Sequence, residues 1–315
     1  MNKRILSLLL AVLLPASATA CGNGSAKTDE TTNASDTNGG NAETASTETA
    51  LTDALPDGLD FGGATYTIYA REDLEWGTEM YVDELTGEIV NDAIYNRSRN
   101  VDERLNVAIT QVTAPGIWGN ETSFNEAIRS AVMAGDSSYQ LVAGYAYYIT
   151  ALATDGLFMN LLDVPHIDFE KPWWNSDLRD ELTLYDQLYF ACGDLSLTLL
   201  SSGDAEMIGA VTEALAFDSY ENVTPAYFES AMKAKYSQDE ASARMLDIIR
   251  DGLTFNFGFV NSSSCENMIH ILRDVAKSNK GYATIYAENE AKYTAALDTL
   301  VAKYKELGEK LSAAK

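Results

Sequence analysis

The sequence contains few residues of the kind that build metal centres. Its three cysteines are Cys21, Cys192 and Cys265, its two histidines are His166 and His270, and no CxxC pair occurs. Structural zinc sites need several such ligands at close spacing, so we expect neither a metal site nor a cofactor. If Cys21 is modified, the other two cysteines could pair in an oxidising compartment, but no feature of the sequence brings them together. Two buried free thiols are the simpler expectation.

Positive charge is also scarce. Asp and Glu number 47 against 22 Lys and Arg, which gives a formal net charge of -25 at pH 7. Nucleic acids and anionic membrane surfaces repel such an acidic chain, so neither is expected as a partner. After Ala20 no segment is long and apolar enough to span a bilayer. Any association with a membrane would therefore depend on a lipid anchor.

Motifs of several common enzyme classes are missing. The chain has no Gly-x-Ser-x-Gly elbow, no Walker loop and no Gly-x-Gly-x-x-Gly. Paired carboxylates for glycoside hydrolysis remain an alternative, because only their separation in space would identify a pair among so many Asp and Glu. No catalytic residue is assigned, and we expect a protein without enzymatic activity.

Residues 1–20 have the pattern of a signal peptide. Lys3 and Arg4 precede an unbroken apolar run from Ile5 to Leu14, and small residues follow. Spanning a bilayer takes roughly 20 apolar residues, so this run is too short to remain as a membrane helix. We expect an exported protein.

Cys21 is the expected site of lipidation. The residues before it resemble a bacterial lipobox, with Ala18 where such boxes usually carry Leu. The same residues fit ordinary signal peptidase, which would release a secreted protein instead. Residues 22–50 contain no aromatic and no large aliphatic residue, so 21–53 are predicted to form a flexible tether of about 30 Å. A lipid anchor on the extracellular face of the cytoplasmic membrane explains both features.

Residues 54–200 are predicted to form an α/β lobe. The alternation of residues 64–70 predicts a strand with Tyr66 and Ile68 on one face. Further strands are predicted at 107–112, 139–144 and 187–192, and helices around 90–105 and 124–132. Their order is typical of a parallel sheet with covering helices. Residues 201–315 are predicted to be almost entirely helical, and the apolar stripe of a last helix at 282–311 indicates a packing face.

Aromatic residues are concentrated beyond the ends of these elements. Ligands of open α/β sheets bind beyond the carboxyl ends of the strands, and flat rings suit the apolar faces of sugars. Each ring taken singly is more often part of a core than a ligand contact, and the Trp173-Trp174 pair after a proline could simply pack against the sheet. The predicted binding residues are Trp76, Tyr145, Tyr147 and Trp173 for stacking, and Glu75 and Asp194 for polar contacts.

A series of motifs suggests a family. In chain order these are Leu55-Pro56-Asp57-Gly58-Leu59, Asn91-Asp92-Ala93, Val101-Asp102-Glu103-Arg104-Leu105, Pro172-Trp173-Trp174-Asn175, Gly193-Asp194-Leu195-Ser196 and Pro225-Ala226-Tyr227. Together they resemble the family 1-like extracellular solute-binding lipoproteins of Gram-positive ABC importers, a group tied to sugar uptake. The resemblance implies a fold of the periplasmic-binding-protein type II class, in which two lobes close on a hinge, and a permease partner that receives a sugar or oligosaccharide.

The chain departs from that family at one point. Family members carry a long stretch before the helix that begins near Asp204, whereas here it shrinks to Leu197–Gly203. The resemblance therefore implies an internal deletion that removes most of the second lobe. Two alternatives to solute binding remain, a surface structural or interaction lipoprotein and a secreted glycoside-active enzyme.

Overall fold

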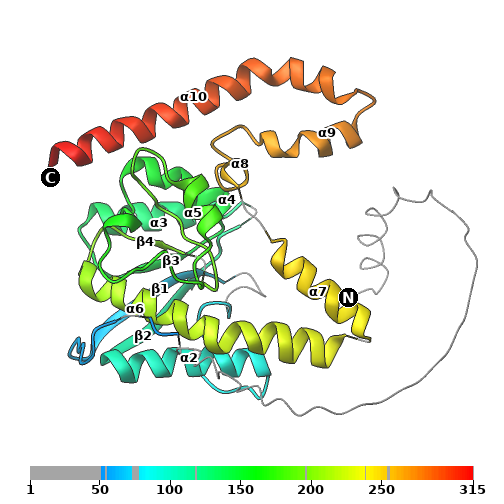
Figure 1. Cartoon of the computed structure of the whole chain (residues 1–315). Helices are drawn as coiled ribbons and strands as arrows, with labels where there is room; N and C mark the ends of the chain where they lie inside the picture. Colours follow the sequence, from blue (N-terminus) through cyan, green and yellow to red (C-terminus); the bar gives the residue numbers. More distant parts are fainter. Residues whose placement is uncertain are drawn as a thin grey trace, which may run out of the picture. The chain divides into compact units, whose positions relative to one another are not determined.

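The computed structural model describes residues 51–53, 55–72, 78–117, 119–195, 197–237, 239–253 and 256–314 (Figure 1). The predicted signal peptide, the lipidation of Cys21 and nearly all of the predicted tether lie outside the described residues. Asp53, the last residue assigned to the tether, is buried and accepts two hydrogen bonds from the guanidinium of Arg104. The packed part of the chain therefore includes Asp53.

A four-stranded sheet forms the centre of the described structure. The strands are β1 (Ala64–Arg71), β2 (Val107–Ala114), β3 (Leu141–Ala143) and β4 (Thr198–Leu199), in the spatial order β2-β1-β3-β4. β1 pairs in parallel with both β2 and β3, and β4 runs antiparallel to β3. The predicted α/β class with a mostly parallel sheet is confirmed.

The strand predicted at 187–192 is wrong. These residues make only isolated bridges, Leu184 with Gln187 and Ala191 with Leu197, and the fourth strand of the sheet is β4. Leu188 and Tyr189 are almost fully buried, so the segment has the apolar run of a central strand without its pairing. A short apolar run alone does not distinguish a strand from other buried backbone.

Helices cover both faces of the sheet. The hydroxyl group of Tyr66 lies 2.9 Å from that of Thr212 on α6 (Ala205–Asp218), while the ring of Tyr69 stacks on Phe124 of α3 (Glu121–Met133) at 4.5 Å. Side chains at odd separations along a strand point to opposite faces, so α6 and α3 pack on opposite sides of β1. α2 (Ile89–Leu105) lies beside α6 (Figure 1).

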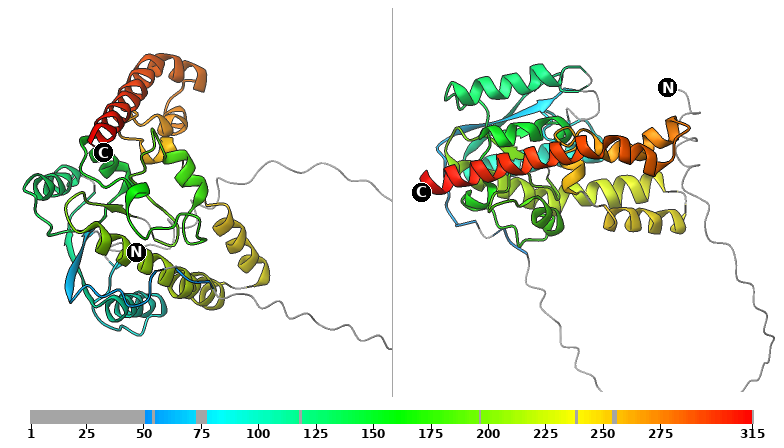
Figure 2. Two further views of the ribbon diagram at one scale, coloured as in Figure 1. Left: turned by 60° about the vertical axis from the view of Figure 1, so that its left-hand side comes forward. Right: turned by 90° about the horizontal axis from the view of Figure 1, so that it is seen from above.

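The helix α6 continues without a break into two π-helical segments. These are η3 (Ser219–Val223) and η4 (Ala226–Tyr236), and both contact α2 (Figure 2). Pro225 lies between them. A proline in the interior of an α-helix removes a hydrogen bond and clashes with the preceding turn, and the wider π turns accommodate it. The helical geometry therefore changes from α to π at Ser219. Residues of the π-helical segments line the candidate site described below.

The remaining regular elements of the described residues are helices, and the carboxyl-terminal part is almost entirely helical, as predicted. Between β3 and β4 lie α4 (Ala146–Ile149), η1 (Thr150–Asp155), η2 (Leu161–Asp163) and α5 (Ser176–Leu182). After η4 come α7 (Glu240–Asp251), α8 (Phe257–Val260), η5 (Met268–His270), α9 (Ile271–Lys277) and α10 (Tyr282–Ala314). α10 packs on α9 and on η1. None of the helices in the described part of the chain has the length and apolar character of a membrane span.

Candidate functional site

The carboxyl ends of β1 and β3 meet where the direction of the chain across the sheet reverses. β2 lies on one side of β1 and β3 on the other, so the connections after β1 and after β2 run in opposite directions. Open α/β sheets bind ligands at such a point. A pocket of about 270 Å³ opens there and is lined by Arg71 at the end of β1, Ala143 at the end of β3 and the following Tyr145.

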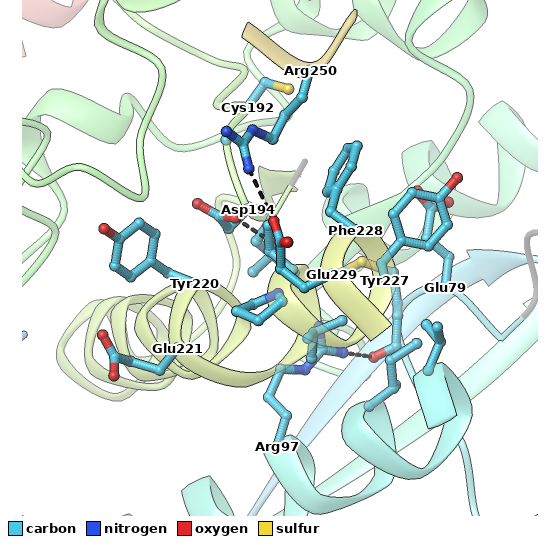
Figure 3. Close-up of a pocket in the computed structure, with 18 of the residues that line it drawn as sticks. Glu79, Arg97, Cys192, Asp194, Tyr220, Glu221, Tyr227, Phe228, Glu229 and Arg250 are labelled. Carbon is cyan, nitrogen blue, oxygen red and sulfur yellow. Dashed lines mark hydrogen bonds and ion pairs between the residues drawn. The ribbon is translucent and has the colours of Figure 1, made fainter. Parts of the chain in front are cut away.

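A larger cleft of about 1250 Å³ adjoins this pocket (Figure 3). The two share Glu79, Met80 and Cys192 as lining residues. The walls of the cleft come from the first half of α2, from η3 and η4, from the loop that contains Asp194, and from Arg250 on α7. The cleft and the pocket therefore form one continuous candidate site.

Three aromatic side chains on the π-helical segments line the cleft. They are Tyr220, Tyr227 and Phe228 (Figure 3). The rings of Tyr227 and Phe228 meet edge to face with centroids 5.0 Å apart, and Tyr227 is 44% exposed. These residues were not among the predicted binding residues, because their spacing fits a helix that packs on its neighbours. Their signal in the sequence is the Pro225-Ala226-Tyr227 motif, which places a ring directly after a helix-disturbing proline.

Four carboxylates and two guanidinium groups share the cleft. Glu229 is held by Lys233 at 2.8 Å and by Arg250 at 3.5 Å, so its charge is already balanced. Asp194 accepts a hydrogen bond from the hydroxyl of Thr224, while burial raises the pKa of its carboxyl. The other lining groups of this kind are Glu79, Glu221 and Arg97.

Glu79 lies where the pocket meets the cleft. Its side chain is exposed to solvent, but surrounding protein atoms still raise the pKa of the carboxyl. The charges of Arg71 and Arg97 act in the opposite direction and favour the ionised form. A carboxylate between two cations at the junction of two cavities is suited to accept hydrogen bonds from a ligand.

Arg97 forms part of the cleft wall and is almost fully buried. Its terminal nitrogens donate to the backbone oxygen of Met80 and, at 3.0 Å, to the hydroxyl of Ser219. Its Nε has no hydrogen-bond partner within the described chain. Burial lowers the pKa of the guanidinium to about 10, against the attraction of Asp218 and Glu79. Arg97 therefore ties α2 to η3 and to the segment at Met80, and so fixes the spacing of two cleft walls.

The position of Asp194 depends on close backbone packing. The amide of Asp194 donates to the carbonyl oxygen of Trp173 at 3.0 Å, and Asn175 donates its amide to the carbonyl oxygen of Cys192 at 2.8 Å. A Cβ atom on Gly193 would lie 2.0 Å from the oxygen of Trp173, so only glycine fits between them. The loop is thus held directly against the Trp173-Trp174 segment.

Glu213 of α6 holds the Trp173-Trp174 segment in place by hydrogen bonds. Its two carboxylate oxygens accept hydrogen bonds from Nε1 of Trp173 at 3.0 Å and from Nε1 of Trp174 at 2.9 Å. Glu213 is fully buried, and this burial raises the pKa of its carboxyl to about 7. The indole donors and the amide of Asp168 lower it in part, and the charge of Asp168 raises it. A chain of contacts therefore leads from Glu213 through the tryptophans to Asp194 in the cleft.

The structure brings together only some of the predicted binding residues. Asp194 lines the cleft and Tyr145 lines the adjoining pocket. Tyr147 stacks on Tyr145 at 5.7 Å, but its hydroxyl donates to Asn267 in the carboxyl-terminal part. Trp173 is 0% exposed and has no free ring face, so the structure places it in the core and not on a ligand.

The remaining predictions concern Glu75, Trp76 and the cysteines. Glu75 and Trp76 lie outside the described residues. Cys265 is buried, Cys192 is half-buried at the cleft, and the two do not form a disulfide with each other. The expectation that Cys192 and Cys265 do not pair agrees with this, but the expectation that both are buried is wrong for Cys192.

Within the described ranges, no group of three or more His, Cys, Asp and Glu side chains is placed to hold a metal ion. Comparisons with protein-family models, with curated proteins and with solved structures found no match to the chain. A proposal for the function therefore depends on the geometry of the cleft and the pocket.

Proposed function

We propose that the protein is the solute-binding component of an ABC importer, which captures an extracellular carbohydrate and presents it to a permease. The observation that carries the proposal is the cleft of about 1250 Å³ beside the carboxyl ends of β1 and β3. Ligand sites commonly combine such concavity with aromatic walls and a few polar groups. A lipid anchor at Cys21 would keep this cleft near the extracellular face of the membrane.

The lining of the cleft suits a saccharide. The exposed ring of Tyr227 offers an apolar face to the C–H surface of a sugar ring, with Tyr220 on the preceding π-helical segment η3. Asp194, Glu221 and the amide of Asn91 supply acceptors and donors for hydroxyl groups. No reaction is needed for capture, so these groups act by binding alone.

The proposed function includes a proposal about the fold. We assign the described sheet and its helices to one lobe of a type II periplasmic-binding protein whose second lobe is largely missing. Two observations support this assignment: only residues 200–204 connect β4 to α6, and Met245, Ile248 and Ile249 on α7 are more than half exposed. A second lobe would cover such a face. Sequencing the gene again between the codons of Leu197 and Gly203 tests whether the deletion is present in the genome.

A surface interaction lipoprotein is the second candidate. The exposed apolar face of α7 favours it, because large apolar patches on a protein surface often mark contacts with other proteins. It predicts a folded protein whose melting temperature responds to no sugar. The glycoside-active enzyme has no such supporting observation, and release of reducing sugar from a polysaccharide would be required to revive it.

A thermal-shift screen against monosaccharides and oligosaccharides tests the proposal. Ligand at about 100 times Kd stabilises a protein by roughly 2.7 kcal/mol, which raises the melting temperature by several degrees. The variant Tyr227→Ala should raise the sugar concentration needed for the same shift in melting temperature at least tenfold. Tyr282→Ala, which removes a similarly exposed ring on α10, should leave this concentration unchanged. If no sugar shifts the melting temperature of the folded protein, carbohydrate binding is disproved.

A further inference from the structure

The smaller pocket differs from the cleft in the chemistry of its walls. Its interior is lined by apolar side chains, while Arg71, Glu79 and Tyr145 are its charged and phenolic lining groups. The apolar lining residues are Val142, Ala143, Ala146, Ile149, Leu178, Leu182, Phe190, Ala191, Leu197, Phe259 and Val260. Most of these residues are buried in the core. The pocket is therefore an apolar recess beside a polar cleft.

The recess is large enough for an organic group. Its volume is about 270 Å³, whereas an engineered protein cavity of about 150 Å³ with aliphatic and aromatic walls is known to bind benzene. An aromatic ring or a short branched alkyl chain would fit. Several waters would also fit, but the apolar walls offer them few hydrogen-bond partners.

A sugar ring is a poor occupant of this recess. Each hydroxyl that leaves water without a hydrogen-bond partner costs about 1–3 kcal/mol, and a pyranose carries several hydroxyls. An apolar group gains roughly 25 cal/mol for each Å² that it buries. The walls therefore select against the saccharide that the cleft would hold.

The rim of the recess is built to keep its shape. The guanidinium of Arg71 lies over the ring of Tyr145 at 5.3 Å, and Tyr147 stacks on the same ring. A Cβ atom on Gly144 would lie 2.6 Å from a methyl group of Ile149, so the backbone and the wall are already in close contact. The recess is thus bounded by ordered groups on the side of β3.

The cleft and the recess communicate through Glu79, Met80 and Cys192, which line both. We propose that the recess is a subsite for an apolar substituent, and that the natural ligand is a saccharide conjugate with an aryl or short alkyl group at one end. This inference rests on the proposed function for the saccharide part. The inference that the ligand carries an apolar group depends on the recess alone.

Phenol serves as a probe of the recess without any sugar. Its binding is followed by ligand-observed NMR on the full-length mature protein and is expected to saturate with one site. Ala146→Leu adds a larger side chain to the wall and should abolish this binding, as should Ala143→Leu. Ala151→Leu makes the same change at an exposed position of η1 and should leave binding unchanged. Melting curves identify which variants are folded.

The second arm compares phenyl and methyl glycosides of the same sugars. Because its phenyl group fills the recess, the phenyl glycoside should bind at least tenfold more tightly than the methyl glycoside of the same sugar. Ala146→Leu should remove this preference, while the methyl glycoside should still bind. Phenol binding without any glycoside binding would support the recess and disprove the carbohydrate proposal. Absence of phenol binding to the folded protein, or equal binding by a folded Ala146→Leu variant, would disprove the subsite whatever the sugars do.

Discussion

Trp173 donates the hydrogen of its Nε1 to Oε1 of Glu213 across 3.0 Å inside the core. The neighbouring Trp174 binds the other carboxylate oxygen at 2.9 Å. A buried carboxylate usually has a cationic partner, but within the described chain Glu213 has only neutral hydrogen-bond donors. Its protonation state therefore matters for the stability of the segment that supports Asp194.

The first prediction concerns the pH dependence that Glu213 causes. Burial raises its pKa from 4.5 to about 7, so the folded protein holds this proton more tightly than the unfolded chain. The resulting stabilisation is fully present below about pH 4.5 and is lost as the pH rises through 7, in total roughly 3 kcal/mol. Denaturant titrations followed by tryptophan fluorescence at pH 5 and pH 8 measure it.

Glu213→Gln is the control for this pH dependence. Glutamine does not titrate, so the difference in unfolding free energy between pH 5 and pH 8 should shrink by the contribution of Glu213. The side-chain NH₂ group of the glutamine would also face an indole N–H group, so one of the two hydrogen bonds to the tryptophans is lost. This loss should destabilise the protein by about 1–3 kcal/mol at pH 5. An unchanged difference between the two pH values in this variant would contradict the assignment.

The second prediction concerns Gly193. Gly193→Ala places a methyl group 2.0 Å from the carbonyl oxygen of Trp173, so the loop must move. Overpacking of this kind costs about 1–3 kcal/mol or more, and a drop of several degrees in melting temperature is expected. Gly281→Ala is the matched control, because a Cβ atom there meets nothing within 4 Å. Equal melting temperatures for the two variants would show that the loop is not held as described.

The third prediction concerns Arg97. Arg97→Met keeps much of the side-chain volume but leaves the buried oxygen of Met80 and the hydroxyl of Ser219 without their donor. The expected loss is about 2–4 kcal/mol of unfolding free energy, measured by denaturant titration. Arg244→Met, at an exposed position on α7, should change it by less than about 0.5 kcal/mol. A similar effect of both substitutions would mean that Arg97 is not a structural tie.

Local patterns explain which parts of the fold could be predicted from the sequence. The alternation of residues 64–70 identified β1, and the stripe on residues 282–311 identified most of α10, because both periods are set by the backbone of the element itself. The segment 187–192 has no such period, since residues 187–191 are all buried and only Cys192 reaches the cleft. Its apolar run suggested a strand of the sheet, but its bridges go to the neighbouring residues Leu184 and Leu197.

The candidate site was predicted less well, for a related reason. Trp173 follows a proline in a loop, which suggests exposure, but its partner Glu213 lies 40 residues further along the chain. Tyr227 and Phe228 fall within a region predicted to be helical, which suggests packing, but in the π-helical segment η4 both line a cleft. Exposure at both places depends on tertiary contacts that no local pattern encodes.

The last prediction compares two isoleucines on different helices. Ile128 on α3 is 0% exposed and Ile248 on α7 is 61% exposed. Ile128→Ala should therefore cost about 2–5 kcal/mol of unfolding free energy, while Ile248→Ala should cost less than about 0.5 kcal/mol. Denaturant titration of the two variants at low protein concentration measures both. A large effect at Ile248 would mean that another part of the chain or a second copy covers α7 in solution, and the proposal that a missing lobe leaves this face bare would then be wrong.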